Sequence, residues 1–250
     1  MSPSNSSLPR LGIVFPDDPI ASEMHRLDRW LEGRGFRAAT AVTLLSKGTG
    51  GHFREDLLAT GDLAAISPVA RSLAERGSGA VIWACTSASF IGGLDWARDQ
   101  AAGLAQASGV PSSSTTLAFI AALEALKARR VHILGAYPRP VTQAFIDCLA
   151  TAGFVVDAWR ALNALDGASS FRLDLAKEVA RFADRLPDGD AAPLLIPDTA
   201  IDSLDLLTRL ESGCGRRVLS ANQVTLWHGL RLLGIKQAVP RAGSLLVGSL

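Results

Sequence analysis

The chain alternates short apolar runs with longer stretches of helical pattern, and no other feature limits its fold as strongly. Apolar runs typical of strands fall at residues 11–15, 38–44, 80–84, 131–136, 155–159, 193–197 and 217–219. Helical patterns fall at residues 19–34, 54–76, 89–107, 116–129, 140–152, 171–186, 201–211 and 224–233. Strands that alternate with helices of this length indicate βαβ units and a parallel sheet covered on both faces.

A weak internal repeat divides the chain into two similar halves. The first half contains GIVFP, AVIWACTSAS and GVPSSSTTLAFIAALEAL, and the second contains VHILGAYP, APLLIPDTAID and RRVLSANQVTLWHGLRLLG in the same order. We therefore predict an α/β fold of two similar doubly wound parallel-sheet halves. The predicted organisation is a flexible tail at 1–10, a first half of 11–115 with 221–250, and a second half of 116–220. Because ligands bind outside the carboxyl ends of parallel strands, the active site is expected in the cleft between the halves.

Composition excludes several classes of protein. With 48% hydrophobic and 20% charged residues among 250, the chain is not disordered. A net charge of +1 gives no electrostatic case for nucleic acid or for an anionic membrane surface. No apolar run approaches the ~20 residues of a membrane span, and the first residues lack the apolar core of a signal peptide. The 3 cysteines, without metal-ligand spacing, favour a reducing, cytoplasmic setting over a disulfide framework or a zinc site.

Cys85 is the strongest candidate for chemistry. It ends a predicted strand and begins a Thr-Ser-Ala-Ser segment that opens a helix. Backbone N–H groups at a helix N-terminus lower the pKa of a thiol from about 8.5 into a range of roughly 3.5–7.5, and a thiolate can attack carbon or move a proton. Thr86 and Ser87 add donors for a carboxylate or an oxyanion. The competing interpretation is a small, buried apolar cysteine.

Asp198 occupies the matching place in the second half, where a strand is followed by Asp-Thr-Ala and a helix. Its competing interpretation is a helix N-cap. A thiol and a carboxyl facing each other across one cleft suit two-sided proton transfer, with Thr199 and Ala200 beside the substrate. Tyr137, the only tyrosine, also follows a strand. Its phenol either donates to a substrate carboxylate or packs at the cleft edge.

The remaining polar motifs carry weaker signals. The glycine-rich segment 47–53 lacks the ending of a P-loop and the spacing of a dinucleotide fingerprint, so it is interpreted as a loop at the cleft mouth that closes as a lid. The histidines show no spacing that supports a hydrolase triad. Arg139 either binds an anion or is solvated. Packing roles are predicted for Cys148 and His228, and Cys214, in a Ser-Gly-Cys-Gly segment, is given no role in the chemistry.

Four segments resemble the maleate cis–trans isomerase and arylmalonate decarboxylase branch of the Asp/Glu racemase superfamily. They are ACTSASF around Cys85, the GVP…TT…ALEAL run, GAYPRPVT around Tyr137, and the tail VPRAGSLL. The resemblance covers almost the whole chain from Leu11 onward. It implies a two-half α/β fold with the active site between the halves and neither a metal nor an organic cofactor.

The family typically has a cysteine after a strand in each half. In maleate isomerases, the resemblance implies, the first cysteine adds to the double bond, rotation follows about the resulting single bond, and the second cysteine donates a proton. Racemase relatives use the pair as base and acid on opposite faces of a stereocentre. Decarboxylase relatives keep one cysteine, which protonates an enediolate after CO₂ leaves.

This sequence departs from the family pattern at two acidic positions. Cys85 matches the first cysteine and Tyr137 matches the substrate-binding tyrosine, but Asp198 stands where the second cysteine is expected. Asp17 replaces a substrate-binding asparagine, and a further asparagine has no clear counterpart, with Gly167 or Asp166 near its place. Like charges a few ångströms apart cost several kcal/mol at an effective dielectric near 20. Either Asp198 therefore has a raised pKa and donates the proton, or the substrate is less anionic than maleate or carries an amine.

These interpretations predict a cofactor-independent isomerase or racemase of a small carboxylic acid. Cys85 is the nucleophile or acid/base and Asp198 the opposing acid/base. The alternatives are a decarboxylase of a malonate-like acid and a relative that binds a ligand without turnover. A small acid is the only expected partner, without nucleic acid or membrane, and a homodimer is ordinary for such a family. Substrate contacts are expected from Asp17, Thr86, Ser87, Tyr137, Thr199 and Ala200.

Overall fold

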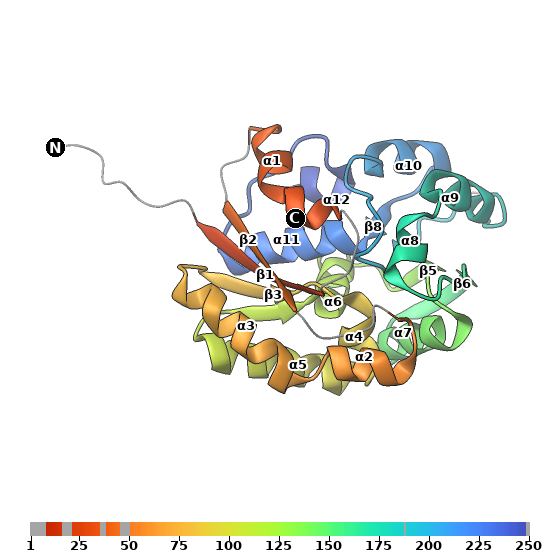
Figure 1. Cartoon of the computed structure of the whole chain (residues 1–250). Helices are drawn as coiled ribbons and strands as arrows, with labels where there is room; N and C mark the ends of the chain where they lie inside the picture. The colour runs from red at the N-terminus through yellow and green to blue at the C-terminus, as the bar shows by residue number, and fades with distance from the viewer. Residues whose placement is uncertain (1–8, 17–21, 36–38, 46–50, 188, 249–250) are drawn as a thin grey trace.

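The computed structural model describes residues 9–16, 22–35, 39–45, 51–187 and 189–248. Its described strands form two four-stranded sheets, in the orders β2-β1-β3-β4 and β6-β5-β7-β8, and all neighbours pair in parallel (Figure 1). The strands are β1 (Arg10–Pro16), β2 (Ala39–Leu45), β3 (Ala80–Trp83), β4 (Ser112–Ser114), β5 (Arg130–Gly135), β6 (Val155–Ala161), β7 (Leu194–Ile196) and β8 (Val218–Ser220).

The two sheets repeat one topology. Strands β5 to β8 take the places of β1 to β4 in the second sheet. The predicted fold class of two similar parallel-sheet halves is confirmed. Most of the strands are short apolar runs, as expected where both faces of a parallel sheet are covered, and every residue of β3 and β7 is buried. The Ser-rich β4 is not among the strands predicted from apolar runs, because its residues are polar.

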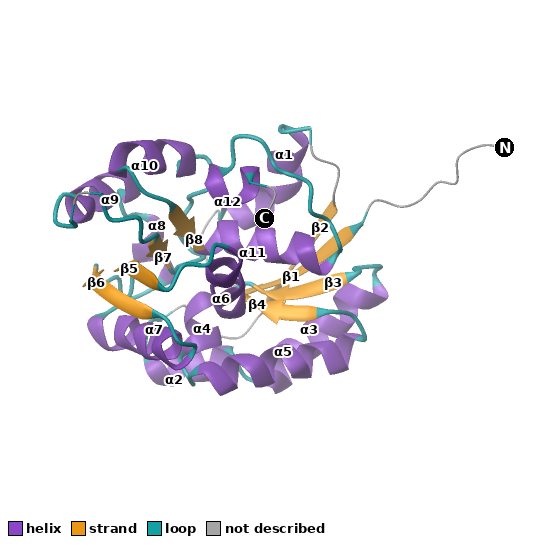
Figure 2. Cartoon of the chain, turned by 180° about the vertical axis from the view of Figure 1, so that it is seen from behind, coloured by secondary structure: helices purple, strands orange, loops and turns teal. Residues whose placement is uncertain are grey.

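Helices surround the sheets, with α6 and α11 in contact at the centre of the molecule (Figure 2). The described helical segments are η1 (Glu23–Arg26), α1 (Leu27–Glu32), α2 (Arg54–Thr60), α3 (Leu63–Glu75), α4 (Thr86–Phe90), α5 (Leu94–Ser108), α6 (Thr115–Ala125), α7 (Arg139–Thr151), α8 (Gly167–Phe171), α9 (Leu175–Ala183), α10 (Leu207–Cys214), α11 (Ala221–Leu232) and α12 (Gly243–Val247). Within the parts of the chain described here, no helix has both the length and the apolar character that crossing a membrane requires.

Three long predicted helices are each divided in the structure. Gly61 separates α2 from α3, where a Cβ would lie 2.6 Å from the Ala88 carbonyl oxygen. Gly93, with φ of 89°, separates α4 from α5, because only glycine takes this conformation without strain. Residues 171–186 likewise divide, with the end of α8 followed by α9. The helix predicted at 201–211 is wrong in its first part, because the backbone N–H groups of Ser203 and Leu204 donate to the Glu23 carboxyl instead of to helical carbonyls.

A row of aromatic rings crosses the molecule from α6 towards the strand ends. Phe119 of α6 lies 5.5 Å from Phe145 of α7, and Phe145 lies 5.1 Å from Phe90 of α4. Phe90 in turn lies 5.7 Å from Tyr137, whose ring is 4.7 Å from that of His52. Edge-on and tilted pairs at these distances attract one another beyond their buried area. The row therefore connects α6, α7 and α4 with Tyr137 and His52.

Replacing Phe145 by alanine should lower the free energy of unfolding by about 3–5 kcal/mol, because it empties a fully buried ring position between two other rings. Urea unfolding followed by circular dichroism measures the loss. The matched control is Phe53→Ala: this ring is 54% exposed, so a change within about 0.5 kcal/mol is expected. Equal losses in the two variants would contradict the role given to the aromatic row.

Candidate active site

Three predicted site residues follow three strands at the same interval. Cys85 comes two residues after the end of β3, Tyr137 two after β5, and Asp198 two after β7. Neighbouring strands β5 and β7 are parallel, so Tyr137 and Asp198 leave the second sheet at the same edge. Cys85 and Asp198 hold equivalent places in the two halves, as the internal repeat predicts.

Cys85 is held at the start of a firmly anchored turn. The side chain is 7% exposed and its Sγ lies 3.9 Å from Oγ of Ser87. The first turn of α4 is held in place at its Thr86 carbonyl oxygen, which lies 2.8 Å from Ser89 Oγ and 3.3 Å from Thr116 Oγ1, within hydrogen-bond distance of both hydroxyls. The hydroxyls of Ser89 and Thr116 also bond to each other at 2.6 Å. These hydrogen bonds therefore hold the turn that follows Cys85 in place.

Asp198 is a buried carboxyl in the second half. It is 4% exposed, and its Oδ1 accepts a hydrogen bond from the Ala200 N–H at 2.9 Å. Burial raises the pKa of this carboxyl, while His52, the Ser170 hydroxyl and the Ala200 N–H act in the opposite direction. A raised pKa increases the share of the protonated acid near neutral pH, which is what a proton donor needs.

Tyr137 is a buried phenol whose pKa responds to both the thiol of Cys85 and the carboxyl of Asp198. Burial raises its pKa well above the usual value, and the charges of Asp198 and Cys85 raise it further, whereas hydrogen bonding to Ser87 and Thr86 lowers it. The phenol thus lies within electrostatic reach of both groups and beside the two hydroxyls. Because its pKa is raised, the phenol stays protonated over the working range and can donate a hydrogen bond.

His52 is the site residue that the sequence did not indicate. Its ring packs edge-on against Tyr137 at 4.7 Å, and its Nδ1 is 2.9 Å from the Ala164 carbonyl oxygen. The backbone N–H of His52 also donates to the carbonyl of Leu165 at 2.8 Å. Since a carbonyl can only accept, Nδ1 carries a proton. His52 is 6% exposed and acts electrostatically on Asp198.

The other predicted site residues have mixed outcomes. Thr86, Ser87, Thr199 and Ala200 are all buried beside Cys85 or Asp198. Asp17, and residues 47–50 of the expected lid at 47–53, lie outside the described part of the chain. Arg139 stacks its guanidinium on Trp159, 4.5 Å from the ring centroid.

The residues assigned to packing behave as predicted. Cys148 is 1% exposed, and burial raises the pKa of its thiol to about 12, so it remains a neutral thiol. His228 bonds to Ser113 Oγ at 3.1 Å. Burial and the charge of Arg231 lower the pKa of His228 to about 4. Neither Cys148 nor His228 is therefore suited to proton transfer near neutral pH.

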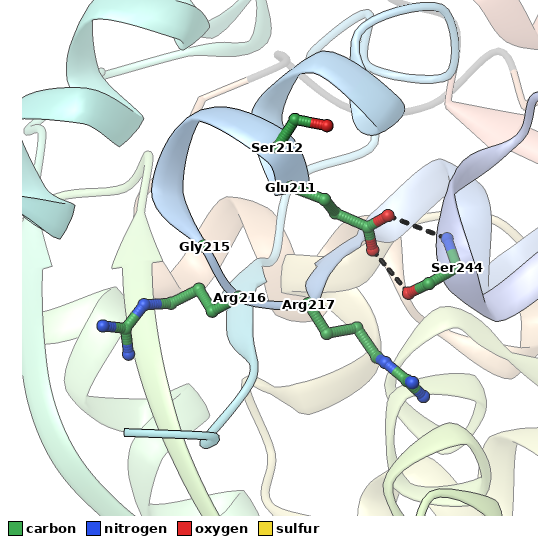
Figure 3. Close-up of a pocket in the computed structure, with 6 residues that line it drawn as sticks. All are labelled: Glu211, Ser212, Gly215, Arg216, Arg217 and Ser244. Carbon is green, nitrogen blue, oxygen red and sulfur yellow. Dashed lines mark hydrogen bonds between the residues drawn. The ribbon is translucent and has the colours of Figure 1, made fainter. Parts of the chain in front are cut away.

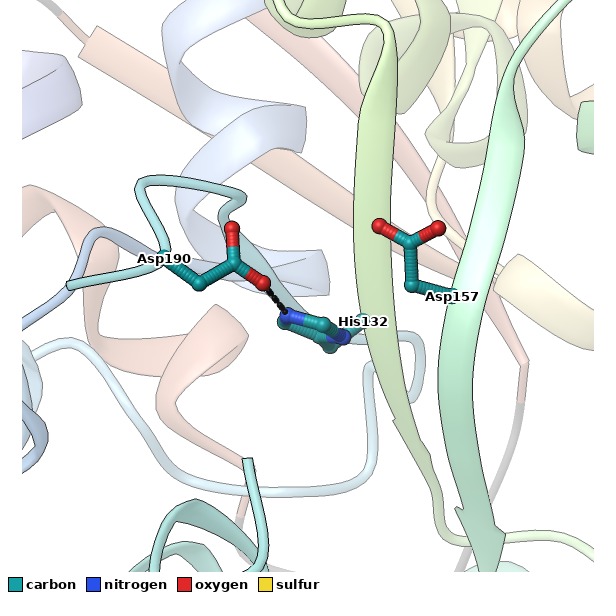
Figure 4. A group of neighbouring side chains, drawn as sticks. All are labelled: His132, Asp157 and Asp190. Atoms are coloured by element: carbon teal, nitrogen blue, oxygen red, sulfur yellow. Dashed lines mark hydrogen bonds and ion pairs between the residues drawn. The ribbon is translucent and has the colours of Figure 1, made fainter. Parts of the chain in front are cut away.

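A second group of titratable side chains lies at the second sheet, where His132 of β5, Asp157 of β6 and Asp190 come together (Figure 4). His132 Nε2 is 2.7 Å from Asp190 Oδ2. Arg130 pairs with Asp157 at 2.7 Å, and Arg216 approaches Asp190 at 4.0 Å. Two guanidinium groups balance the two carboxylates, so the group is a neutral ion-pair network and a poor site for a cation.

A surface depression of about 380 Å³ lies between α10 and α12 (Figure 3). Glu211 there accepts hydrogen bonds from the Ser244 N–H and Oγ at 2.9 and 2.6 Å. Arg216 and Arg217 extend away from Glu211 and from each other, so no cationic pocket forms. At this depression the hydrogen bonds between Glu211 and Ser244 hold α12 against α10.

The fold and the strand-end residues define a class of duplicated α/β proteins with titratable groups after equivalent strands. The chain belongs to the arylmalonate decarboxylase family, whose sequence model matches residues 61–246. This confirms the branch that the sequence resembles, and the relatives agree with the prediction of an enzyme of the isomerase type, with a decarboxylase as the alternative.

Several relatives support this assignment. The chain is 29% identical to a maleate isomerase of Pseudomonas putida over 67% of this chain and 69% of the relative. It is 28% identical to the arylmalonate decarboxylase of Bordetella bronchiseptica over 66% and 69%. A Nocardia farcinica maleate cis–trans isomerase, solved as a cysteine-to-serine mutant with a covalently bound succinylcysteine intermediate, has a TM-score of 0.85 at 25% identity, covering 96% of this chain and 98% of its own.

Replacing Asp198 by asparagine should raise the free energy of unfolding at pH 8 by about 1 kcal/mol. A folded-state pKa above the unfolded value stabilises the protein at low pH, and this contribution is lost as pH rises through the folded pKa. Asparagine keeps the acceptor for the Ala200 N–H and stays neutral. Urea unfolding at pH 5 and pH 8 should show the variant's advantage only at the higher pH.

The control for this measurement is Asp99→Asn, which makes the same change at an exposed position of α5. We expect no pH-dependent difference from wild type in that variant. An Asp198→Asn protein that is no more stable than wild type at pH 8 would show that burial does not raise the Asp198 pKa.

Proposed function

We propose that the protein is a cofactor-independent isomerase or racemase that acts on a small carboxylic acid. The observation that carries this proposal is the pair of buried groups, the Cys85 thiol and the Asp198 carboxyl, both within electrostatic reach of Tyr137. Maleate-type isomerisation is the reaction that the relatives favour.

The proposed isomerisation uses the two groups in turn. The Cys85 thiolate forms a C–S bond to one alkene carbon, and the Asp198 carboxylic acid gives its proton to the other carbon. The C–C double bond becomes a single bond, and rotation follows. The Asp198 carboxylate then removes a proton from the same carbon, the C–S bond breaks, and the trans alkene leaves. The succinylcysteine in the Nocardia farcinica relative is the adduct that such an addition gives from maleate.

Neighbouring groups would stabilise the charges in this sequence. Tyr137, Thr86 and Ser87 supply hydroxyls for a substrate carboxylate or for the negative charge that develops after addition. Thr199 and Ala200 line the opposite side. The positive charge of a doubly protonated His52 would stabilise the carboxylate that proton transfer leaves on Asp198. Asp17 remains a proposed contact for an amine or a neutral group of the substrate.

A decarboxylase of a malonate-like acid is the second candidate. It is favoured by the family's own description and by the presence of one cysteine rather than two at the equivalent strand ends. In that reaction Cys85 would protonate the enediolate left after CO₂ departs, and Asp198 would act on the opposite face. We also propose a reducing, cytoplasmic setting, because an odd number of cysteines suits it, and a homodimeric assembly.

Proton NMR of the wild-type protein with small acids in D₂O tests the proposal. The panel contains maleate, aspartate, glutamate, hydantoins and phenylmalonate. Fumarate formed from maleate would establish isomerisation. Deuterium at an α-carbon would establish racemisation, and deuterated phenylacetate would establish decarboxylation.

Cys85→Ser should reduce turnover by at least about a thousandfold with little change in stability, since it removes the nucleophile and keeps the shape of the side chain. Turnover retained by Cys85→Ser would refute the role of Cys85.

Replacing Asp198 by cysteine should raise the rate of maleate isomerisation. The substitution restores the second cysteine expected from the family and removes a carboxyl that repels a dianionic substrate. Initial rates of fumarate formation measure the gain at saturating maleate, with Asp99→Cys as the control for an added thiol. A folded Asp198→Cys variant with no gain would place the specificity for the natural substrate elsewhere in the site.

A further inference from the structure

Glu23 is a buried carboxyl that the proposed chemistry does not use. It lies in η1, in the segment that follows β1, and is 7% exposed. Its Oε1 accepts from the Ser203 N–H at 2.9 Å, the Ser203 Oγ at 3.1 Å and the Asn222 amide at 2.6 Å. Its Oε2 accepts from the Leu204 N–H at 3.0 Å. Four donors therefore converge on one side chain.

These donors belong to parts of the chain that are remote from Glu23 in sequence. Ser203 and Leu204 lie in the irregular loop that begins at the end of β7 and contains Asp198. Asn222, in the first turn of α11, also donates to the Ile201 carbonyl at 3.0 Å. Glu23 consequently ties a helix of the first half to the loop that presents Asp198 in the second half.

More exposed polar contacts join the same loop to η1 and α1. The Glu23 N–H donates to Asp202 Oδ1 at 2.8 Å, and Arg26 pairs with Asp202 Oδ2 at 2.7 Å. Further along, Asp205 accepts from the Trp30 indole at 2.9 Å and from Arg34 at 2.7 Å. These outer ion pairs are partly exposed and contribute little by themselves, so the buried Glu23 carboxyl is the central member of the contact.

We propose that Glu23 is a positioning residue that clamps the Asp198 loop against the first half and so keeps the carboxyl of Asp198 opposite the thiol of Cys85. The loop has no regular secondary structure before α10, and its backbone N–H groups at 203 and 204 use Glu23 as their acceptor. Without that carboxyl these amides lose their partner, and the loop loses its fixed distance from η1.

The clamp depends on pH in a definite direction. Burial raises the pKa of Glu23 to about 7, although its hydrogen bonds to Asn222, Ser203 and Leu204 lower it; the charge of Asp202, the acidic group that faces it from the loop, adds to the increase. An opened, solvated Glu23 has its ordinary, lower pKa. Protonation of Glu23 therefore favours the conformation in which the Asp198 loop is bound to it. This conformation becomes less stable as pH rises through about 7.

Hydrogen exchange of the backbone amides tests the clamp without any activity assay. In Glu23→Ala, the amides of Ser203 and Leu204 should exchange at least about tenfold faster than in wild type, because each loses its acceptor. Glu23→Gln, which keeps one acceptor oxygen, should show a smaller increase. Glu32→Ala, an exposed glutamate of α1, is the matched control and should leave exchange unchanged. Unchanged protection in Glu23→Ala would overturn the proposal.

The wild-type protein supplies a second readout if Glu23→Ala does not fold. After correction for intrinsic exchange, protection of the same amides should fall as pH rises from 6 to 8, and Glu23→Gln should remove this dependence. Protection that is constant or rises with pH would contradict the clamp. A third readout depends on the proposed function: kcat should fall more than KM rises in Glu23→Gln, since the residue positions Asp198 rather than binding substrate. Loss of exchange protection without any detectable turnover would support the clamp and count against the proposed function alone.

Discussion

Neighbouring parallel strands end at one edge of their sheet, and the arrangement of the candidate site depends on this constraint. Because β5 and β7 pair in parallel, Tyr137 and Asp198 emerge together. The first sheet repeats the strand order of the second, and Cys85 therefore occupies the place that corresponds to Asp198. The only other requirement for the site is packing that holds these edges of the two sheets near each other. The contact between α6 and α11 and the row of aromatic rings provide this packing.

Burial then decides the chemistry of these groups. A solvated aspartate has a pKa near 3.9 and is almost never protonated at neutral pH. Within the protein, desolvation acts on Asp198, Tyr137 and Glu23 alike and raises the pKa of each. The same desolvation that makes a carboxyl useful as an acid costs folding free energy when the group is ionised. Hydrogen bonds from backbone amides and hydroxyls offset part of this cost at Asp198 and Glu23.

The sequence was sufficient to predict those features that depend on local pattern. Apolar runs located seven of the strands, and the residues that follow them included Cys85, Tyr137 and Asp198. Features that depend on tertiary contacts were not predictable in this way. His52 reaches the site only because its backbone and ring bond to residues 164 and 165, more than a hundred positions away. Glu23 looks like an ordinary helical glutamate until Ser203 and Asn222 are brought to it.

The hydrogen bond from the Ala200 N–H to Asp198 has a consequence for recognition. A carboxylate oxygen is a strong acceptor, so Asp198 occupies a backbone donor that a cysteine at the same place would engage only weakly. On the Cys85 side, the hydroxyls of Thr86, Ser87 and Tyr137 remain grouped together. The two ends of the site are thus chemically unequal. The Cys85 end is rich in hydrogen-bond donors, whereas at the Asp198 end the Ala200 N–H already donates to Asp198. Under the proposed function, such a site would suit an unsymmetrical ligand, with a carboxylate at one end and a neutral or cationic group at the other.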